Sequence, residues 1–102
     1  MTRGAIPDDV PSNLQEQILL EDARSQPGIQ IQGGPRKPLG DTPRLIANYG
    51  GVAEDWYKIS SNQSAIIDGA IVEIHWFRNN RTRQNVEYKI KRTYPKTAPK
   101  NQ

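Results

Sequence analysis

Residues 71–77 read I-V-E-I-H-W-F and residues 86–91 read V-E-Y-K-I-K, and both stretches alternate apolar with charged side chains. A period of two is typical of a strand that has one buried face and one exposed face. The polar stretch between them, N-N-R-T-R-Q, has the length of a hairpin loop. The two stretches are therefore predicted to pair as an antiparallel hairpin.

The hairpin predicts which side chains share a face, because successive residues of a strand point to opposite sides. The buried face is predicted to hold Val72, Ile74, Trp76, Val86, Tyr88 and Ile90. The exposed face is predicted to hold Glu73, His75, Glu87, Lys89 and Lys91. If Asn80, Arg81 and Thr82 form the loop tip, His75 lies opposite Glu87 and Glu73 lies opposite Lys89. A slip of one residue would move one strand's set to the other face.

The remaining sequence predicts short elements before the hairpin. Ser12 resembles a helix cap, and Thr42 followed by Pro43 resembles a second one. The predicted elements are a helix over 13–24, a Gly/Pro-rich loop over 26–42 with an extended piece at 29–32, a helix of barely two turns that starts at Pro43 and stops at Tyr49, a strand over 56–60 and a polar loop over 61–64. This order predicts an α+β domain, with one or two short N-terminal helices packed on one face of a small twisted antiparallel sheet. The other face is predicted to be open.

Length and composition limit the class of protein. The 102 residues predict one domain over 1–102 with a modest core, since 34% of them are hydrophobic, and the ends at 1–11 and 95–102 are expected to fray. No apolar run of about 18 residues and no signal-peptide pattern occurs, so we expect a soluble chain without an address of its own. With no cysteine and a single histidine, the composition argues against a zinc centre, and no cofactor is expected.

The positive charge is concentrated toward the C-terminus. The net charge is +3 and the sequence pI is about 9.4, whereas residues 9–22 contain acids and no base. The predicted hairpin carries basic residues in both strands and in its loop: Arg78, Arg81, Arg83, Lys89, Lys91 and Arg92. We interpret this as a groove that follows the phosphates of a nucleic acid. The alternative is a solvated surface that keeps a small protein in solution.

Three motifs carry a resemblance to known proteins. The stretches P-R-L-I-A-N-Y-G-G, D-W-Y-K-I-S-S and D-G-A-I-V-E-I-H-W-F-R-N-N-R-T-R-Q-N-V-E-Y-K-I-K, spread over residues 40–91, resemble the C-terminal toxin domains of bacterial polymorphic toxins of the contact-dependent growth inhibition and Rhs types. The resemblance implies a ribonuclease of the barnase/colicin/RelE-like class. It also implies secretion or cell-surface delivery on a larger bacterial carrier, action in the cytoplasm of a target cell, and a cognate immunity protein. Similar chains place glycine where this one has Arg83; a positive φ there would cost arginine about 1 kcal/mol.

The residues themselves fit metal-independent RNA cleavage. That reaction needs a base for the 2′-hydroxyl proton, a cation for the charge that builds on phosphate, and an acid for the leaving 5′-oxygen. The predicted catalytic residues are His75, Glu73, Glu87 and Lys89, with His75 first because histidine titrates near neutrality. The predicted RNA-binding residues are Lys58, Tyr57, Arg78, Lys91 and Arg92. The substrate is expected to be tRNA or another RNA.

Simpler interpretations stay open beside this one. His75 could be a surface histidine beside Glu87, and the Glu–Lys pairs could be cross-strand ion pairs worth about 0.2–1 kcal/mol each. Trp56 and Trp76 are expected in the core, whereas Tyr57 is expected to face away from it and to stack on an unpaired base. The chain could also be a non-catalytic nucleic-acid-binding module or a protein-interaction domain. A DNase is less expected, because DNA hydrolysis usually recruits a divalent ion.

Overall fold

The computed structural model describes residues 9–95, and they form the predicted α+β domain of two helices and one antiparallel sheet. The elements are α1 (Leu14–Arg24), β1 (Ile29–Gly33), α2 (Thr42–Tyr49), a short 3-10 turn η1 (Ala53–Asp55), β2 (Trp56–Ser60), β3 (Ala65–Ile67), β4 (Ala70–Asn79) and β5 (Gln84–Thr93). Both predicted helices, the extended piece, the strand over 56–60 and the hairpin are confirmed. Most of the two ends that were predicted to fray lie outside the described residues.

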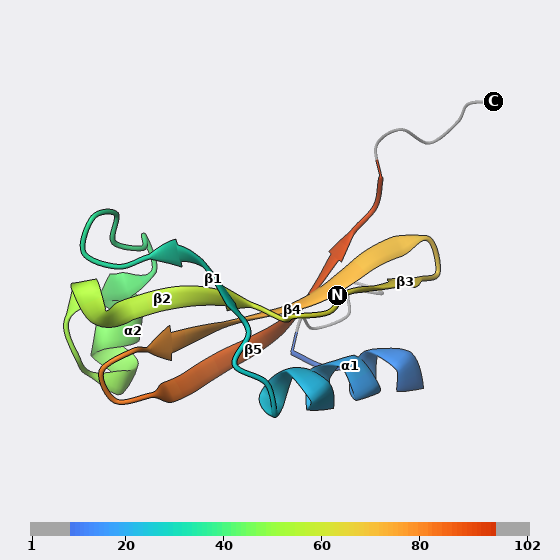
Figure 1. The fold of residues 1–102 in the computed structure, drawn as a ribbon, viewed down its shortest axis with the longest axis horizontal. Helices are drawn as coiled ribbons and strands as arrows, with labels where there is room; N and C mark the ends of the chain where they lie inside the picture. Colours follow the sequence, from blue (N-terminus) through green and yellow to red (C-terminus); the bar gives the residue numbers. More distant parts are fainter. Residues whose placement is uncertain (1–8, 96–102) are drawn as a thin grey trace, which may run out of the picture.

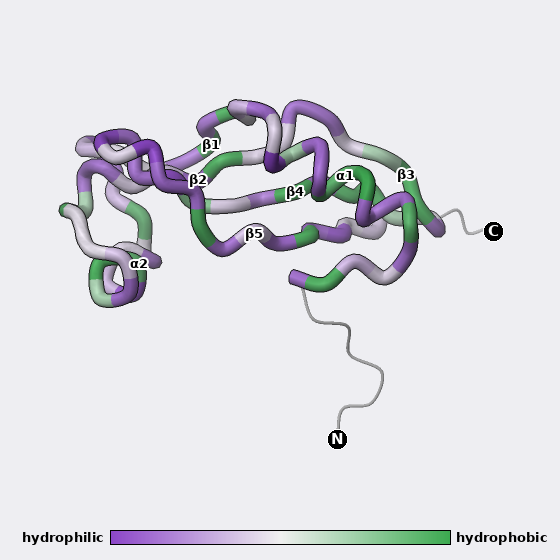
Figure 2. Tube along the Cα trace, turned by 90° about the horizontal axis from the view of Figure 1, so that it is seen from below, coloured by the Kyte–Doolittle hydropathy of each residue, from purple (hydrophilic) through white to green (hydrophobic). Residues whose placement is uncertain are grey.

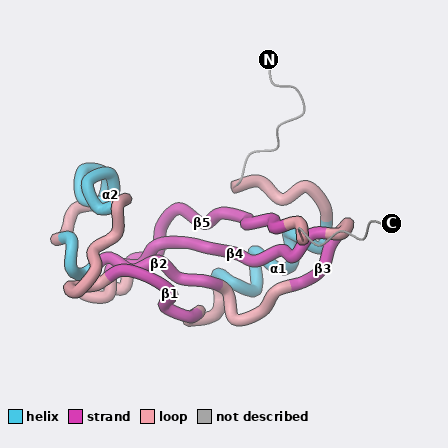
Figure 3. The backbone as a smooth tube through the Cα atoms, turned by 90° about the horizontal axis from the view of Figure 1, so that it is seen from above, coloured by secondary structure: helices cyan, strands magenta, loops and turns pink. Residues whose placement is uncertain are grey.

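Strand β4 is the centre of the sheet. One edge of β4 pairs with β2 through residues 75–79 and with β3 through residues 70–72, and its other edge pairs with β5. Strand β1 pairs with β2 and forms an outer edge, so β1, β2, β4 and β5 lie side by side in Figure 3. Strand β3 was not predicted. It forms a tight hairpin with β4 through Asp68 and Gly69, whose φ angles of 50° and 82° fit a type I′ turn.

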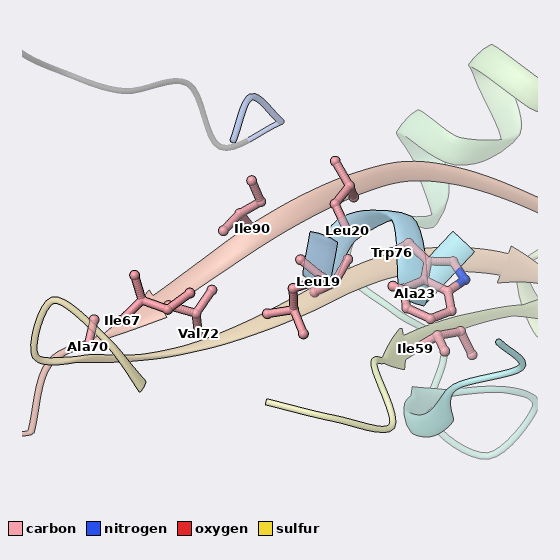
Figure 4. Close-up of a cluster of buried hydrophobic side chains, with 10 residues drawn as sticks. Leu19, Leu20, Ala23, Ile59, Ile67, Ala70, Val72, Trp76 and Ile90 are labelled. Carbon is pink, nitrogen blue, oxygen red and sulfur yellow. The ribbon is translucent and has the colours of Figure 1, made fainter. Parts of the chain in front are cut away.

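Helix α1 covers one face of the sheet and closes the first core. Its Leu19, Leu20 and Ala23 pack on side chains from β2, β3, β4 and β5, as Figure 4 shows. Most of the sheet side chains in this core occupy alternate positions, as the period of two predicts. They are Ile59, Ile67, Ala70, Val72, Ile74, Trp76 and Ile90. Burying one valine, leucine or isoleucine side chain of this core stabilises the fold by roughly 1.5–3 kcal/mol.

The start of α1 is fixed by a reciprocal cap and a buried ion pair. Asn13, one position after the predicted cap Ser12, accepts the Glu16 backbone N–H at 2.8 Å, and Glu16 Oε1 accepts the Ser12 backbone N–H at 2.8 Å. Glu16 is 2% exposed and receives two further hydrogen bonds from the Arg92 guanidinium of β5, at 2.7 and 2.8 Å. The Arg92 hydrogen bonds are the main reason that the pKa of Glu16 falls from 4.5 to about 2.

Helix α2 packs over the opposite face of the sheet, because the neighbouring residues Trp76 and Phe77 of β4 belong to different cores, with α1 and α2 respectively. The two helices lie apart along the long axis in Figures 1 and 3. Leu45 of α2 joins the second of these cores. The other members of that core, Leu39, Trp56, Phe77 and Val86, come from the preceding loop and from β2, β4 and β5. The expectation of a fully open second face is therefore wrong at this end, and only the stretch of that face beyond α2 is open.

The register of the β4–β5 hairpin differs from the predicted one in two places. The loop holds four residues, 80–83, between the paired Asn79 and Gln84, and a bulge follows between the pairs Phe77–Val86 and His75–Lys89. The loop shift turns Val86 away from Trp76 and into the second core, so its predicted place in the first core is wrong. The bulge then returns Lys89 to the face of His75, and hydrophilic and hydrophobic segments still alternate along β5 in Figure 2.

Replacing Arg83 by glycine is expected to raise the free energy of unfolding by roughly 0.5–1 kcal/mol. Arg83 closes the hairpin loop with a φ of 67°, a conformation that glycine adopts without the clash of a side chain. Chemical denaturation of the two proteins measures the difference. The matched control is Arg81→Gly in the same loop, which is expected to lower stability because Arg81 has no positive φ. A loss of stability in Arg83→Gly would contradict the strain at this position.

Candidate functional site

A basic hollow lies on the open part of the sheet, on the face opposite α1. It has a volume of about 190 Å³. Its lining comes from the start of α2 and from β2, β4 and β5: Asp41, Lys58, His75, Phe77, Lys89, Ile90 and Lys91. We call this set of residues the basic hollow. It joins the only histidine of the chain to three lysines.

His75 and Glu73 form the polar centre beside the hollow. They are two positions apart on β4, so both side chains point to the open face. His75 Nε2 lies 3.0 Å from Glu73 Oε1, and the His75 side chain is 16% exposed while that of Glu73 is 41% exposed. When Nε2 carries the proton and donates it to Glu73, Nδ1 is an acceptor. The carboxylate thus fixes the tautomer and orientation of the ring, as in other carboxylate–histidine pairs.

The lysines reach this centre from the neighbouring strands. Lys89 lies opposite His75 and Lys91 lies opposite Glu73 in the β4–β5 pairing. Lys58 reaches the same face from β2, where it pairs with Phe77. Side chains opposite each other in a sheet have Cβ atoms about 5 Å apart, within reach of one phosphate group. The predicted pairs, His75 with Glu87 and Glu73 with Lys89, are wrong because the longer loop and the bulge shift β5 by two residues.

Glu87 lies away from His75 and holds α2 against β5. It occupies the bulge with a φ of 59°. Its carboxylate accepts from Arg44 Nη2 at 2.7 Å and from the Tyr49 hydroxyl at 3.2 Å. Its hydrogen bond is the main reason that the pKa of Arg44 is raised, and burial followed by the Glu87 charge raises the pKa of Tyr49. Glu87 therefore binds residues of α2 and is not hydrogen-bonded to His75 among the described residues.

The predicted RNA-binding residues divide between the two faces. Lys58 and Lys91 line the basic hollow. Tyr57 is half-buried against the first core, contrary to the expectation that it faces away from the core, and Arg92 is bound to Glu16 on the same side. Arg78 is 6% exposed and donates to the Pro27 carbonyl and to Asn85. These three side chains are therefore not gathered with His75.

Asp41 was missed by the sequence analysis. It precedes Thr42, the predicted cap, but the helix begins at Thr42 and Asp41 is its N-cap residue. Asp41 lines the basic hollow and binds Arg44 Nη1 at 3.0 Å. An aspartate directly before Thr-Pro is a sequence signal for a helix cap. Its position close to the lysines depends on how α2 packs, and the local sequence does not encode that packing.

The described residues contain neither a membrane-crossing helix nor a cluster of metal-ligating side chains. Within residues 9–95, no helix is both long and apolar enough to cross a membrane. In the same part of the chain, no group of three or more His, Cys, Asp and Glu side chains is placed to hold a metal ion. Comparison of the chain with models of known protein families, with curated protein sequences and with solved structures found no match.

Proposed function

We propose that this chain is a small toxin ribonuclease that cleaves tRNA or another RNA without a metal ion. The 2′-hydroxyl of the RNA is the attacking group. The observation that carries the proposal is the basic hollow, in which His75 is held by Glu73 and faces Lys89 across the strand pair. This reaction requires a base, a cation for the phosphate and an acid for the leaving oxygen, and a carboxylate that orients the base assists it. The open sheet face gives an RNA strand room to lie across them.

The reaction can be written with these side chains. His75 Nδ1 takes the proton of the 2′-hydroxyl while that oxygen forms a bond to phosphorus. Lys58 and Lys91 bind the phosphate oxygens on which negative charge builds. The bond from phosphorus to the 5′-oxygen breaks, and the Lys89 ammonium gives that oxygen a proton. The products are a 2′,3′-cyclic phosphate and a 5′-hydroxyl, and exchange with water restores both protonation states.

The biological setting of the proposal comes from the resemblance in the sequence. In that setting the domain is delivered on a larger bacterial protein, acts in the cytoplasm of the target cell and is neutralised by a cognate immunity protein. The net charge of +3 fits a polyanionic substrate, and it would equally suit an acidic inhibitor protein that covers the hollow.

RNA is expected to be cut while DNA stays intact when the purified protein is incubated with total RNA or plasmid DNA in EDTA. The reason is that DNA lacks the 2′-hydroxyl on which this reaction depends. A denaturing gel reads the products, and the matched control is an oligonucleotide with a single ribose at a cleavage site against its all-deoxy counterpart. Cleavage of both oligonucleotides, or loss of RNA cleavage in EDTA, would contradict the mechanism. Intact RNA with salt-sensitive binding would favour the non-catalytic nucleic-acid-binding module.

A further inference from the structure

Arg24 and Arg78 lie near Tyr88 on the α1 face of the sheet, opposite the basic hollow, and Arg83 lies near Arg78. Arg24 ends α1, Arg78 lies near the end of β4, and Arg83 lies in the loop that follows. Arg24 Cζ is 5.5 Å from the centre of the Tyr88 ring, and Tyr88 stacks on Trp76 with ring centres 4.9 Å apart. The name arginine cluster is used below for Arg24, Arg78 and Arg83.

Arg78 is the buried member of the arginine cluster. Among the residues that the structure describes, only neutral groups bind its side chain: Nε donates to Asn85 Oδ1 at 2.9 Å, and Nη2 donates to the Pro27 carbonyl. Among the hydrogen bonds and ion pairs of residues 9–95, none joins Arg78 to a carboxylate, and none uses its Nη1. Removing a cation from water is costly, so buried charges are normally paired with an opposite charge.

The cluster members also act on one another. Burial lowers the pKa of Arg78, and the charge of Arg83 lowers it further. Burial raises the pKa of Tyr88, and the charges of Arg24 and Arg78 oppose that shift. The charge of Arg83 therefore adds to the cost of burying Arg78, while Arg24 meets the cluster through the Tyr88 ring. A bound anion would remove both costs at once.

We infer that the arginine cluster is a second binding site, which takes a phosphate-type oxyanion on the Nη1 side of Arg78. Guanidinium groups match the geometry of phosphate oxygens, and Tyr88 supplies a hydroxyl donor beside an aromatic face. The same chemistry is offered by free phosphate and by the phosphodiester of a nucleic acid. Because the site lies on the face away from the basic hollow, it stands independently of the proposed ribonuclease activity.

Trp76 provides a direct reporter of this site. Its indole N–H donates to Asn85 Oδ1 at 2.9 Å, the same oxygen that Arg78 Nε binds. An anion that draws on the Arg78 guanidinium is expected to shift the Trp76 indole resonance in a nitrogen–proton NMR spectrum. The indole of Trp56, a member of the second core, donates to the Gly50 carbonyl and is the internal control.

The experiment titrates the full chain with sodium phosphate, with sodium chloride at matched ionic strength and, separately, with a short DNA oligonucleotide that lacks the 2′-hydroxyl. A saturable shift of Trp76 with phosphate, without one of Trp56 and without one in chloride, supports the site. A shift at lower concentration with the oligonucleotide identifies a nucleic-acid phosphodiester as the better ligand; the reverse order identifies free phosphate. No saturable shift with either would overturn the inference.

A matched pair of variants separates the site from general charge attraction. Arg83→Gln removes a cluster cation and keeps the backbone of the loop, and it is expected to weaken the anion affinity about tenfold, the effect of losing one charge-assisted contact. Arg81→Gln removes an equal charge from the same loop outside the cluster and is expected to leave the affinity nearly unchanged. Equal losses in the two variants would contradict a defined site.

Discussion

Replacing His75 by alanine is expected to lower the rate of RNA cleavage by a factor of about 10²–10⁴, the usual contribution of a positioned general base. His75 is the only histidine of the chain, and its ring is held at 3.0 Å by Glu73 opposite Lys89. No other imidazole can replace it. The rate is measured at substrate concentrations well below and well above saturation, because loss of a base should lower kcat with little change in KM.

The control for this variant is Thr93→Ala. Thr93 lies two positions beyond Lys91 on β5, is exposed and pairs with Ile71, outside the basic hollow. Its removal is expected to leave the rate unchanged, and both variants should keep the thermal unfolding midpoint of the parent within a few degrees. Equal rates for the parent and the His75→Ala protein would rule out His75 as the base and move the search to Glu73 and the lysines.

Replacing Glu16 by glutamine is expected to lower the free energy of unfolding by about 3 kcal/mol at neutral pH. The Glu16 side chain is 3% exposed and joins α1 to β5 through two hydrogen bonds from Arg92. Glutamine removes the negative charge that accepts these two bonds, and a hydrogen bond to a charged group contributes about 1.5–3 kcal/mol. Chemical denaturation measures the change. The control is Glu21→Gln, the same change at an exposed position of α1, with an expected effect within about 0.5 kcal/mol.

The same ion pair predicts how stability depends on pH. The folded-state pKa of Glu16 is about 2, below its ordinary value of 4.5, so the ionised form favours the fold. Its contribution is therefore fully present above pH 4.5 and is lost as the pH falls toward 2, with a total of about 3 kcal/mol. The stabilities of the parent and the Glu16→Gln protein should converge over this range. A difference that stays constant down to pH 2.5 would show that the charge of Glu16 is not the cause.

The fold was predictable from the sequence where a local pattern decides it. The period of two over residues 71–77 placed Val72, Ile74 and Trp76 in the first core, and the structure buries all three. The Gly/Pro signals located both helices within a residue or two. Strand β3 was missed because its three residues, A-I-I, are too few to show a period, although the Asp68-Gly69 turn was visible.

The candidate site was only partly predictable, because its register depends on contacts between distant elements. Glu87 takes a positive φ in the bulge, where Arg44 and Tyr49 of α2 bind its carboxylate. Nothing local to Glu87 encodes that contact. The longer loop and the bulge each shift β5 by one residue. Val86 lies between them and changes face, whereas Lys89 and Lys91 lie beyond both shifts and keep their predicted face. Arg78 was predicted to bind RNA from its charge alone; its burial against Asn85 and the Pro27 carbonyl could not be predicted, because a cation buried on neutral partners has no local sequence pattern.

The central position of β4 has a consequence for how the molecule moves. Both edges of this strand are paired, its Ile74 and Trp76 belong to the first core, and its Phe77 belongs to the second. Backbone amides in such a strand exchange with solvent only when the whole domain opens. His75 thus lies on the backbone that is best protected from local opening. In the proposed reaction, adjustment to an incoming phosphate would fall to the long lysine side chains around the imidazole, and the imidazole itself would keep its place.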